Sequence, residues 1–227
     1  MPVALVVAAF LGLALQQPTY PPPFPRDGAA KLFENERVAI WDVTWTVGRR
    51  TPLHRHPYPV VGVTLTPGRN RAIRPDGGAT ENDLGELGHV AFAPAGLLHA
   101  EEGASEPGPR LIMIELKGGT RPPLAPVQAM PPPFGASTPG ARVVLENDLV
   151  VVYDFQFDPR NPVPAHHHVR DAVNVTVAPG RVKATTLDGQ ASVSELDFGA
   201  VLFRPRDRAH REDVESGSPR NIIIELK

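Results

Sequence analysis

The chain of 227 residues contains the same unit twice, and this duplication constrains its fold more than any other feature of the sequence. Short motifs recur at an offset of 110 to 112 residues. The recurring pairs are Pro-Pro-Pro-Phe at 21–24 and 131–134, Glu-Asn at 34–35 and 146–147, Pro-Gly-Arg at 67–69 and 179–181, and Glu-Leu-Lys at 115–117 and 225–227. We therefore expect two domains, residues 21–117 and 131–227, each large enough to fold around its own core.

Two segments lie outside the repeated units. Residues 118–130 contain Pro122, Pro123 and Pro126, which predicts an extended, semi-rigid linker. Residues 1–15 are almost entirely apolar but too short for a membrane span. They match the apolar region of a secretory signal peptide, although no Lys or Arg precedes them. We therefore expect a secreted or periplasmic protein; the alternatives are a lipid-facing tether and a misassigned start codon.

Composition excludes several classes of partner. The formal charge of −2 gives no basis for binding nucleic acid or an anionic membrane, and an aromatic content of 6% argues against stacking on single strands. We expect a small-molecule ligand or substrate and no stable membrane span, and a homo-oligomer is compatible with the sequence. The chain has no cysteine, so any metal must bind to histidine, carboxylate or water.

The pattern of both units indicates strands. Runs rich in β-branched and aromatic residues are bounded by Gly and Pro, which favours an all-β sandwich or barrel. The expected strands are 38–45, 60–65, 89–92 and 111–116 in the first unit, and 149–157, 172–177, 200–203 and 221–226 in the second. Helical periodicity is absent from both units.

Six of the eight histidines form two matching sets. Each set consists of His-x-His followed by one histidine just over forty residues later: His54, His56 and His99, then His166, His168 and His210. Alternation along a strand places both imidazoles of His-x-His on one face, and a third from a distant strand can complete a tripod. Three protein ligands with open positions are typical of a catalytic metal site. The alternative is that the histidines were copied with the unit and bind nothing.

These motifs resemble those of the cupin superfamily. Gly48-x5-His54-x-His56 is similar to the start of the first cupin motif, and Gly88-x5-Pro94-x-Gly96-x2-His99 is similar to the second. The second unit repeats the plan as Gly199-x5-Pro205-x-Asp207-x2-His210, with Asp in place of the later Gly and no Gly before its His-x-His. The resemblance implies two tandem jelly-roll β-barrels, a bicupin, with one divalent metal per domain: Fe, Mn, Zn, Cu or Ni.

One departure from the cupin pattern concerns the fourth ligand. The resemblance implies a Glu shortly after His-x-His, where this chain has Val60 and Val61, and Ala172 and Val173. Either the sites are three-histidine sites or another acid replaces the Glu. Glu101 and Glu212, each two residues after the late histidine, are weak candidates for a ligand, base or supporting role. We favour a solvated turn for both.

Other polar residues near the histidines have less certain roles. We expect His89 and His167 to be surface or structural residues. Tyr58 and Asp171 follow the His-x-His pairs without a role fixed by spacing. Arg204, Arg206 and Arg208 replace Ala93, Ala95 and Leu97 of the first unit. This arginine run is either a solvated rim or a clamp for a carboxylate substrate.

Three functions are compatible with this sequence. The first is a metal-dependent oxidoreductase of dioxygenase type acting on a small, oxygen-rich substrate. The second is a non-oxidative metalloenzyme, an isomerase or hydrolase, with the metal as Lewis acid. The third is a non-catalytic ligand-binding protein, since cupins include both enzymes and binding proteins. The open three-histidine arrangement favours the first.

Overall fold

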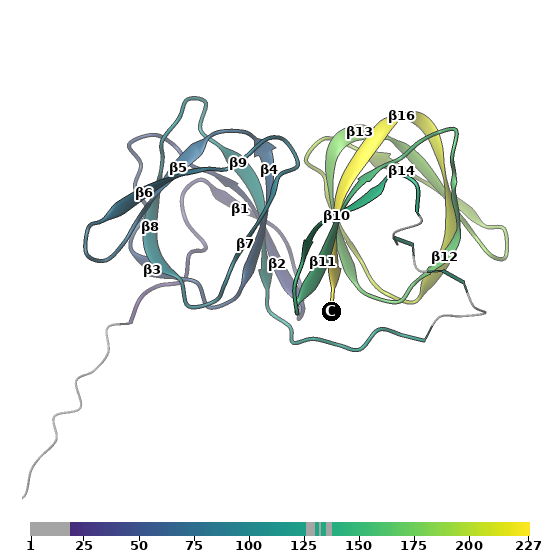
Figure 1. Ribbon diagram of the computed structural model, residues 1–227, viewed down its shortest axis with the longest axis horizontal. Helices are drawn as coiled ribbons and strands as arrows, with labels where there is room; N and C mark the ends of the chain where they lie inside the picture. Colours follow the sequence, from purple (N-terminus) through teal and green to yellow (C-terminus); the bar gives the residue numbers. More distant parts are fainter. Residues whose placement is uncertain (1–18, 126–129, 132, 135–137) are drawn as a thin grey trace, which may run out of the picture.

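The protein consists of two β-barrels that lie side by side (Figure 1). The computed structural model describes residues 19–125, 130, 131, 133, 134 and 138–227, so the expected signal segment and part of the expected linker lie outside it. Every regular element in this part of the chain is a strand, which confirms the all-β prediction. No described helix could span a membrane. The expected domain boundaries stay a prediction.

The first barrel is built from nine strands in two sheets. Its inner sheet, the one next to the second barrel, has the order β1-β2-β9-β4-β7, and its outer sheet has the order β3-β8-β5-β6. The strands are β1 (Ala29–Glu34), β2 (Val38–Thr44), β3 (His54–Arg55), β4 (Val60–Thr66), β5 (Arg69–Ile73), β6 (Ala79–Asp83), β7 (Val90–Ala93), β8 (Leu98–Gly103) and β9 (Arg110–Leu116).

The second barrel repeats this plan with longer strands. Its elements are β10 (Ala141–Glu146), β11 (Val150–Gln156), β12 (Val163–His168), β13 (Ala172–Thr186), β14 (Ala191–Leu196), β15 (Val201–Arg204) and β16 (Arg208–Leu226). β13 corresponds to β4 and β5 joined, and β16 to β8 and β9 joined. Each of these long strands therefore runs from the inner wall to the outer wall, where β12 pairs with β16 and β14 pairs with β13.

The repeated Pro-Pro-Pro-Phe motif closes one part of each barrel. The carbonyl of Pro21 accepts a hydrogen bond from the backbone of Arg55, and that of Pro131 accepts one from His167. The phenyl rings then enter the cores. Phe24 stacks on Trp41 with ring centres 4.8 Å apart, and Phe134 lies 5.3 Å from Tyr153. The motif thus anchors the chain beside the strand that carries each His-x-His pair.

The repeated Glu-Asn motif forms the hairpin turn that opens each inner sheet. The side-chain oxygen of Asn35 accepts hydrogen bonds from the backbone of Arg37 and Val38, at 2.8 and 2.9 Å. Asn147 does the same for Leu149 and Val150, at 2.8 and 3.1 Å. A side chain that mimics the backbone in this way stabilises a tight turn.

The two barrels share one hydrophobic core. Alternate residues of each inner sheet face across the joint, and they form a single buried cluster. Its members are Val38, Ile40, Val61, Val63, Leu65, Ile112, Ile114, Leu116, Val150, Val152, Val173, Val175, Val177, Ile222, Ile224 and Leu226. A buried ion pair, Arg37 with Asp171 at 3.4 Å, lies at the edge of this joint. The joint is thus packed like a domain interior.

Candidate metal centres

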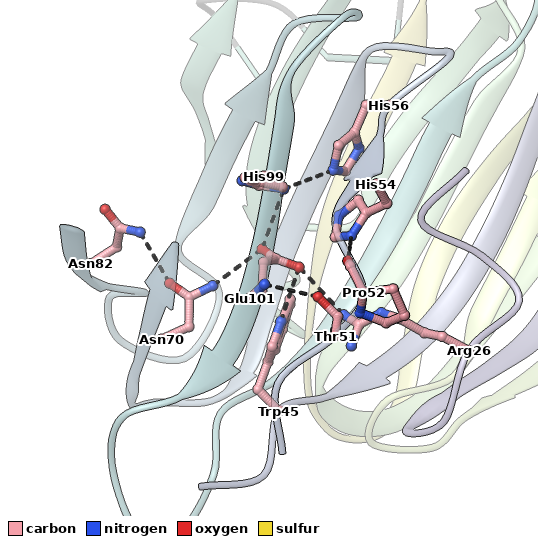
Figure 2. Close-up of polar contacts among 10 residues, drawn as sticks. All are labelled: Arg26, Trp45, Thr51, Pro52, His54, His56, Asn70, Asn82, His99 and Glu101. Carbon is pink, nitrogen blue, oxygen red and sulfur yellow. Dashed lines mark hydrogen bonds and ion pairs between the residues drawn. The ribbon is translucent and has the colours of Figure 1, made fainter. Parts of the chain in front are cut away.

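The first histidine set converges inside the outer wall of the first barrel. His54 on β3 pairs directly with His99 on β8, and His56 lies just beyond β3. The three ring centres are 4.9 to 5.2 Å apart, and the Nε2 atoms of His56 and His99 are separated by 3.1 Å (Figure 2). All three side chains are buried. The structure therefore brings together the three residues that the spacing singled out.

The second set has nearly the same geometry. His166 and His168 lie on β12, and His166 pairs with His210 on β16. The ring centres are 4.7 to 5.0 Å apart, and the Nε2 atoms of His166 and His168 are 3.1 Å from each other. In both sets, one candidate ligand atom from each residue lies within 4.8 Å of the other two.

Backbone carbonyls orient one imidazole in each set. The Nδ1 atom of His54 lies 2.9 Å from the carbonyl of Pro52, and that of His166 lies 2.8 Å from the carbonyl of Pro164. A carbonyl only accepts, so Nδ1 carries the proton and the Nε2 lone pair points toward the other rings. Such a hydrogen bond at the second nitrogen is typical of histidines that bind metals.

Burial disfavours the charged form of four of the six rings, and some buried ring nitrogens have no hydrogen-bond partner in the described part of the chain. Burial lowers the pKa of His56 to about 4 and that of His168 to about 2, and it also lowers the pKa of His54 and His166. Buried Nε2 of His54 has no hydrogen-bond partner among the described residues. Buried polar atoms without partners are rare, and a cation shared by the three rings would satisfy this one.

A left-handed turn leads into the strand that carries the third histidine. Gly96 has a φ of 85°, and Asp207 occupies the same turn in the second barrel with a φ of 69°. Asp tolerates this conformation better than most residues. The second barrel thus departs from the sequence motif at Asp207 but keeps the turn.

Many solved structures resemble this chain, and three different proteins among them match it along most of its length. AerE from Microcystis aeruginosa has 13% identity and a TM-score of 0.64, with 92% of this chain and 98% of that chain covered. Bacillus subtilis oxalate decarboxylase, whose structure is described with Mn(II) centres, has 14% identity and a TM-score of 0.58, with 85% and 69% covered. A cupin 2 conserved barrel domain protein from Leptotrichia buccalis has 12% identity and a TM-score of 0.53, with 88% of each covered.

The protein has the cupin fold. Both the resemblance seen in the sequence and the expected jelly-roll architecture are confirmed at this level. No protein-family model matches the chain, and no curated protein matches it. With identities this low, the solved structures establish the fold of this chain, and its chemistry has to be argued from its own residues.

The first barrel holds Glu101 in a closed polar network. Glu101 lies on β8, is only 8% exposed, and accepts hydrogen bonds from the Trp45 indole at 3.1 Å, the Asn70 amide at 3.3 Å and the Arg26 guanidinium at 3.4 Å (Figure 2). Its Oε1 atom is 3.9 Å from Nε2 of His99. A solvated turn, which the sequence favoured, is therefore wrong for Glu101.

Glu212 occupies the same position in the second barrel but has different neighbours. It lies within β16 and not in a turn, its side chain is 19% exposed, and its carboxylate is 3.5 Å from Nε2 of His210. The residues that correspond to Trp45, Asn70 and Arg26 are Phe157, Val182 and Thr138, as the repeat places them. Phe and Val have no hydrogen-bond donor in their side chains, so the carboxylate is less constrained than that of Glu101.

A cavity of about 430 Å³ reaches His210 of the second histidine set. His210 and Glu212 form part of its wall, together with Arg204, Arg208 and several hydroxyl and amide side chains. Burial and the neighbouring Arg204 lower the pKa of Arg208. A cavity of about 690 Å³ on the first barrel is lined by Arg26, Trp45 and Thr51 among others, but His54, His56 and His99 are not among the described residues of its wall.

The remaining predicted residues fall into two groups. His89 is exposed, as expected. His167 is 2% exposed, so a surface position is wrong for it; its Nε2 lies 3.2 Å from a carboxylate oxygen of Asp207, which supports a structural role. Asp171 is the buried partner of Arg37 at the joint, and its side chain also accepts a hydrogen bond from the backbone of Arg206. Tyr58 is half-buried.

Sequence reasoning missed several residues around the sites. Arg26, Trp45 and Asn70 of the first network carried no metal-ligand signal. Asn174 and Asn221, which line the second cavity, were missed too. A comparison of the two repeats position by position could have identified Asn174 and Asn221. The first repeat has Gly62 and Leu111 at these positions, so the two asparagines are specific to the second repeat.

Proposed function

We propose that this cupin is a metal-dependent enzyme with two three-histidine centres, and that its reaction takes place in the second barrel. The observation that carries the proposal is the meeting of His210, Glu212 and an open cavity in one place. A set of three converging imidazoles fits a divalent transition metal: Fe, Mn, Zn, Cu or Ni. The Mn(II) centres of the structurally similar oxalate decarboxylase support a metal in this fold.

In this proposal, the residues of the second barrel have separate roles in metal binding and proton transfer. His166, His168 and His210 would hold the metal, and Pro164 fixes the orientation of His166. The bound metal would supply Lewis acidity or redox chemistry for a substrate oxygen. Glu212 stands within reach of the ligand shell and can accept a proton from a group bound there.

We propose an oxidoreductase of dioxygenase type as the reaction class, with a small oxygen-rich molecule as substrate. Three protein ligands leave room for both a chelating substrate and a second reactant, and the cavity has the size of a small-molecule site. The position of Glu212 beside His210 favours a second candidate, a non-oxidative isomerase or hydrolase in which the carboxylate is the base.

Metal stoichiometry tests the centres directly. Elemental analysis of tag-free protein should give two metal ions per chain for the wild type and one each for His54→Ala and His166→Ala, because each substitution removes one ligand of a three-ligand set. The control His89→Ala changes an exposed histidine outside both sets and should keep two. Full metal content in either triad variant would show that the ligand assignment is wrong.

Turnover tests the enzyme class. Iron- or manganese-loaded protein is assayed for oxygen uptake and for anaerobic conversion with a panel of enols, flavonoids and small keto acids. We expect oxygen uptake that His166→Ala abolishes and His54→Ala largely retains. Anaerobic conversion alone would support the non-oxidative candidate. Tight metal binding without any turnover would instead support the ligand-binding function and overturn the enzyme proposal.

Export stays part of this proposal. The apolar residues 1–15 support it, and they lie outside the described residues. Mass spectrometry of protein recovered from outside the cytoplasm should find a mature chain that lacks about the first 14 residues. Recovery of exported protein that begins at Met1 would contradict this expectation.

A further inference from the structure

The two barrels differ in the polar groups that surround their histidines. Four positions near the second set carry Asn174, Arg204, Arg208 and Asn221, all in the wall of its cavity. The repeat places Gly62, Ala93, Leu97 and Leu111 at the same positions of the first barrel. Two cations and two amides thus surround one histidine set, where the other set has small or aliphatic residues.

The two arginines stand beside the histidines, and both interact electrostatically with Glu212 in the same cavity wall. Arg208 pairs across the strands with His168, and Arg204 pairs with Ala172 at the start of β13. The Arg208 guanidinium hydrogen-bonds the carbonyl of Pro205 at 3.0 Å. Among the described residues, the closest ion-pair contact of the Glu212 carboxylate is with His210, at 3.5 Å, so Glu212 acts on the two guanidinium groups at longer range. The two guanidinium groups repel each other, and one carboxylate does not neutralise both, so a bound anion would stabilise this part of the cavity.

The two asparagines add a second requirement. The amide oxygens of Asn174 and Asn221 are buried and accept no hydrogen bond from any described residue. Both side chains point into the barrel, because their neighbours Val173, Val175 and Ile222 face the joint. Buried amides of this kind select ligands that donate hydrogen bonds, such as hydroxyl groups. Ser192, Ser194 and Thr186 extend this polar wall.

We propose that the second barrel binds a small hydroxylated carboxylate, whose carboxylate lies on Arg204 and Arg208 and whose hydroxyl groups reach Asn174 and Asn221. Guanidinium groups match the planar carboxylate, and a molecule of this size fits a cavity of about 430 Å³. This ligand class is the substrate class of the proposed enzyme. Binding does not depend on the proposed function; only the conversion of the bound ligand rests on it. The first barrel, with Ala93 and Leu97, does not bind this ligand.

Calorimetric titration of the metal-free protein tests the site apart from the metal. The probes are D-gluconate, L-malate and glycolate, with erythritol as the uncharged polyol and acetate as the carboxylate without a hydroxyl group. We expect gluconate or malate to bind once per chain, with acetate and erythritol at least about 10-fold weaker. No binding of gluconate, malate or glycolate at millimolar concentration, or equal binding of acetate, overturns the proposal.

Substitutions to the residues of the first barrel give matched variants. Arg204→Ala, Arg208→Leu and Asn221→Leu should each weaken binding of the best probe by about 10-fold or more. The control Arg206→Ala removes the same charge from the same segment, but Arg206 contacts the carbonyl of Pro122 and lies outside the cavity wall. It should bind normally. If Arg206→Ala weakened binding as much as Arg208→Leu, the loss would be an effect of net charge. That result would overturn the proposed binding site.

Three further measurements separate folding, inorganic anions and metal binding. The melting temperature and metal content of each variant must match those of the wild type, since the histidine set is unchanged. If Arg208→Leu has a lower melting temperature, the conservative variant Arg208→Lys replaces it. Sulfate and phosphate binding as tight as gluconate binding would contradict recognition of the hydroxyl groups. Gluconate binding in protein that takes up no metal would leave this inference standing and defeat the proposed function.

Discussion

At the residue scale, the two copies use the same carboxylate differently. Glu101 is tied to three donors, one of them the buried Arg26, whereas Glu212 faces a cavity. The carboxylate two residues after the late histidine is thus held in a closed network in one barrel and is available to a ligand in the other. The pattern of the sequence alone treats the two as equivalent, because the donors come from distant strands.

This difference predicts unequal effects on stability. Glu101→Ala leaves Arg26 as a buried, unpaired cation and should lower the free energy of unfolding by roughly 2–4 kcal/mol. Glu212→Ala removes a group with fewer partners and should cost under about 1 kcal/mol. Urea denaturation of both variants in the presence of a chelator measures the two values. Equal losses would show that the network of Figure 2 does not stabilise the first barrel.

A second carboxylate predicts a dependence of stability on pH. Burial raises the pKa of Glu225 to about 7, which Arg170 at 4.0 Å only partly offsets. The folded protein therefore holds this proton where the unfolded chain has lost it. The stabilisation by the neutral form is complete below about pH 4.5 and is lost as the pH rises through about 7, a difference of roughly 3 kcal/mol.

Glu225→Gln isolates this effect from all other titrating groups. The variant should match the wild type in unfolding free energy near pH 4.5 and exceed it near pH 8, because glutamine stays neutral. Tyr153, whose pKa is raised to about 12, is neutral throughout this range and does not interfere. A difference between the two proteins that is the same at both pH values would contradict the assignment.

The histidines could be predicted from the sequence, and the rest of the site could not. Ligand candidates such as His54 and His166 repeat at a fixed spacing, and the period of a strand puts their rings on one face. The cavity wall depends on which residues of β13 and β16 point inward, and on a register that spacing does not encode. The sequence shows Arg208 as one of three arginines at alternate positions. The structure places Arg208 in the cavity wall and Arg206 outside it.

At the element scale, the long buried strands were predicted and the outer ones were missed. The expected strands at 38–45 and 60–65 correspond to β2 and β4, whose apolar runs are unambiguous. β6 and β14 have mostly polar and small residues and lie at sheet edges, so their hydrophobic pattern is weak. The expected strand 172–177 continues in β13 through Pro179 and Gly180, residues that favour a turn, as far as Thr186.

The repeated asparagine turns provide a prediction at this scale. Asn35→Ala and Asn147→Ala should each destabilise the protein by about 1–2 kcal/mol, because each leaves two backbone donors of a hairpin without their acceptor. The matched variants Asn35→Asp and Asn147→Asp keep the acceptor oxygen and should lose less than half as much. Thermal denaturation of the four variants tests this, and equal losses for Ala and Asp would rule out the turn as the cause.

At the scale of the whole molecule, the shared core predicts that the two barrels unfold together. Ile224 of the second barrel packs in the same cluster as Ile114 of the first. Ile224→Ala should therefore cost roughly 2–5 kcal/mol and lower the stability of both barrels. The two tryptophans of the chain, Trp41 and Trp45, lie in the first barrel and report on it alone.

Trp fluorescence and far-ultraviolet circular dichroism should show one coincident transition that Ile224→Ala shifts equally. The control Val193→Ala changes an exposed side chain on β14 and should shift neither signal by more than about 0.5 kcal/mol. A tryptophan transition that Ile224→Ala leaves in place would mean that the barrels unfold independently.

The joint between the barrels also determines which positions of the chain tolerate substitution. Among the described residues, its buried apolar cluster comes from the strands of the inner walls, while β3 and β12, with their His-x-His pairs, lie on the far walls (Figure 1). After a gene for a single barrel has been copied, the residues that hold the copies together are fixed by packing, but the far walls are not. One copy can then acquire new ligand specificity while the other keeps the pair folded.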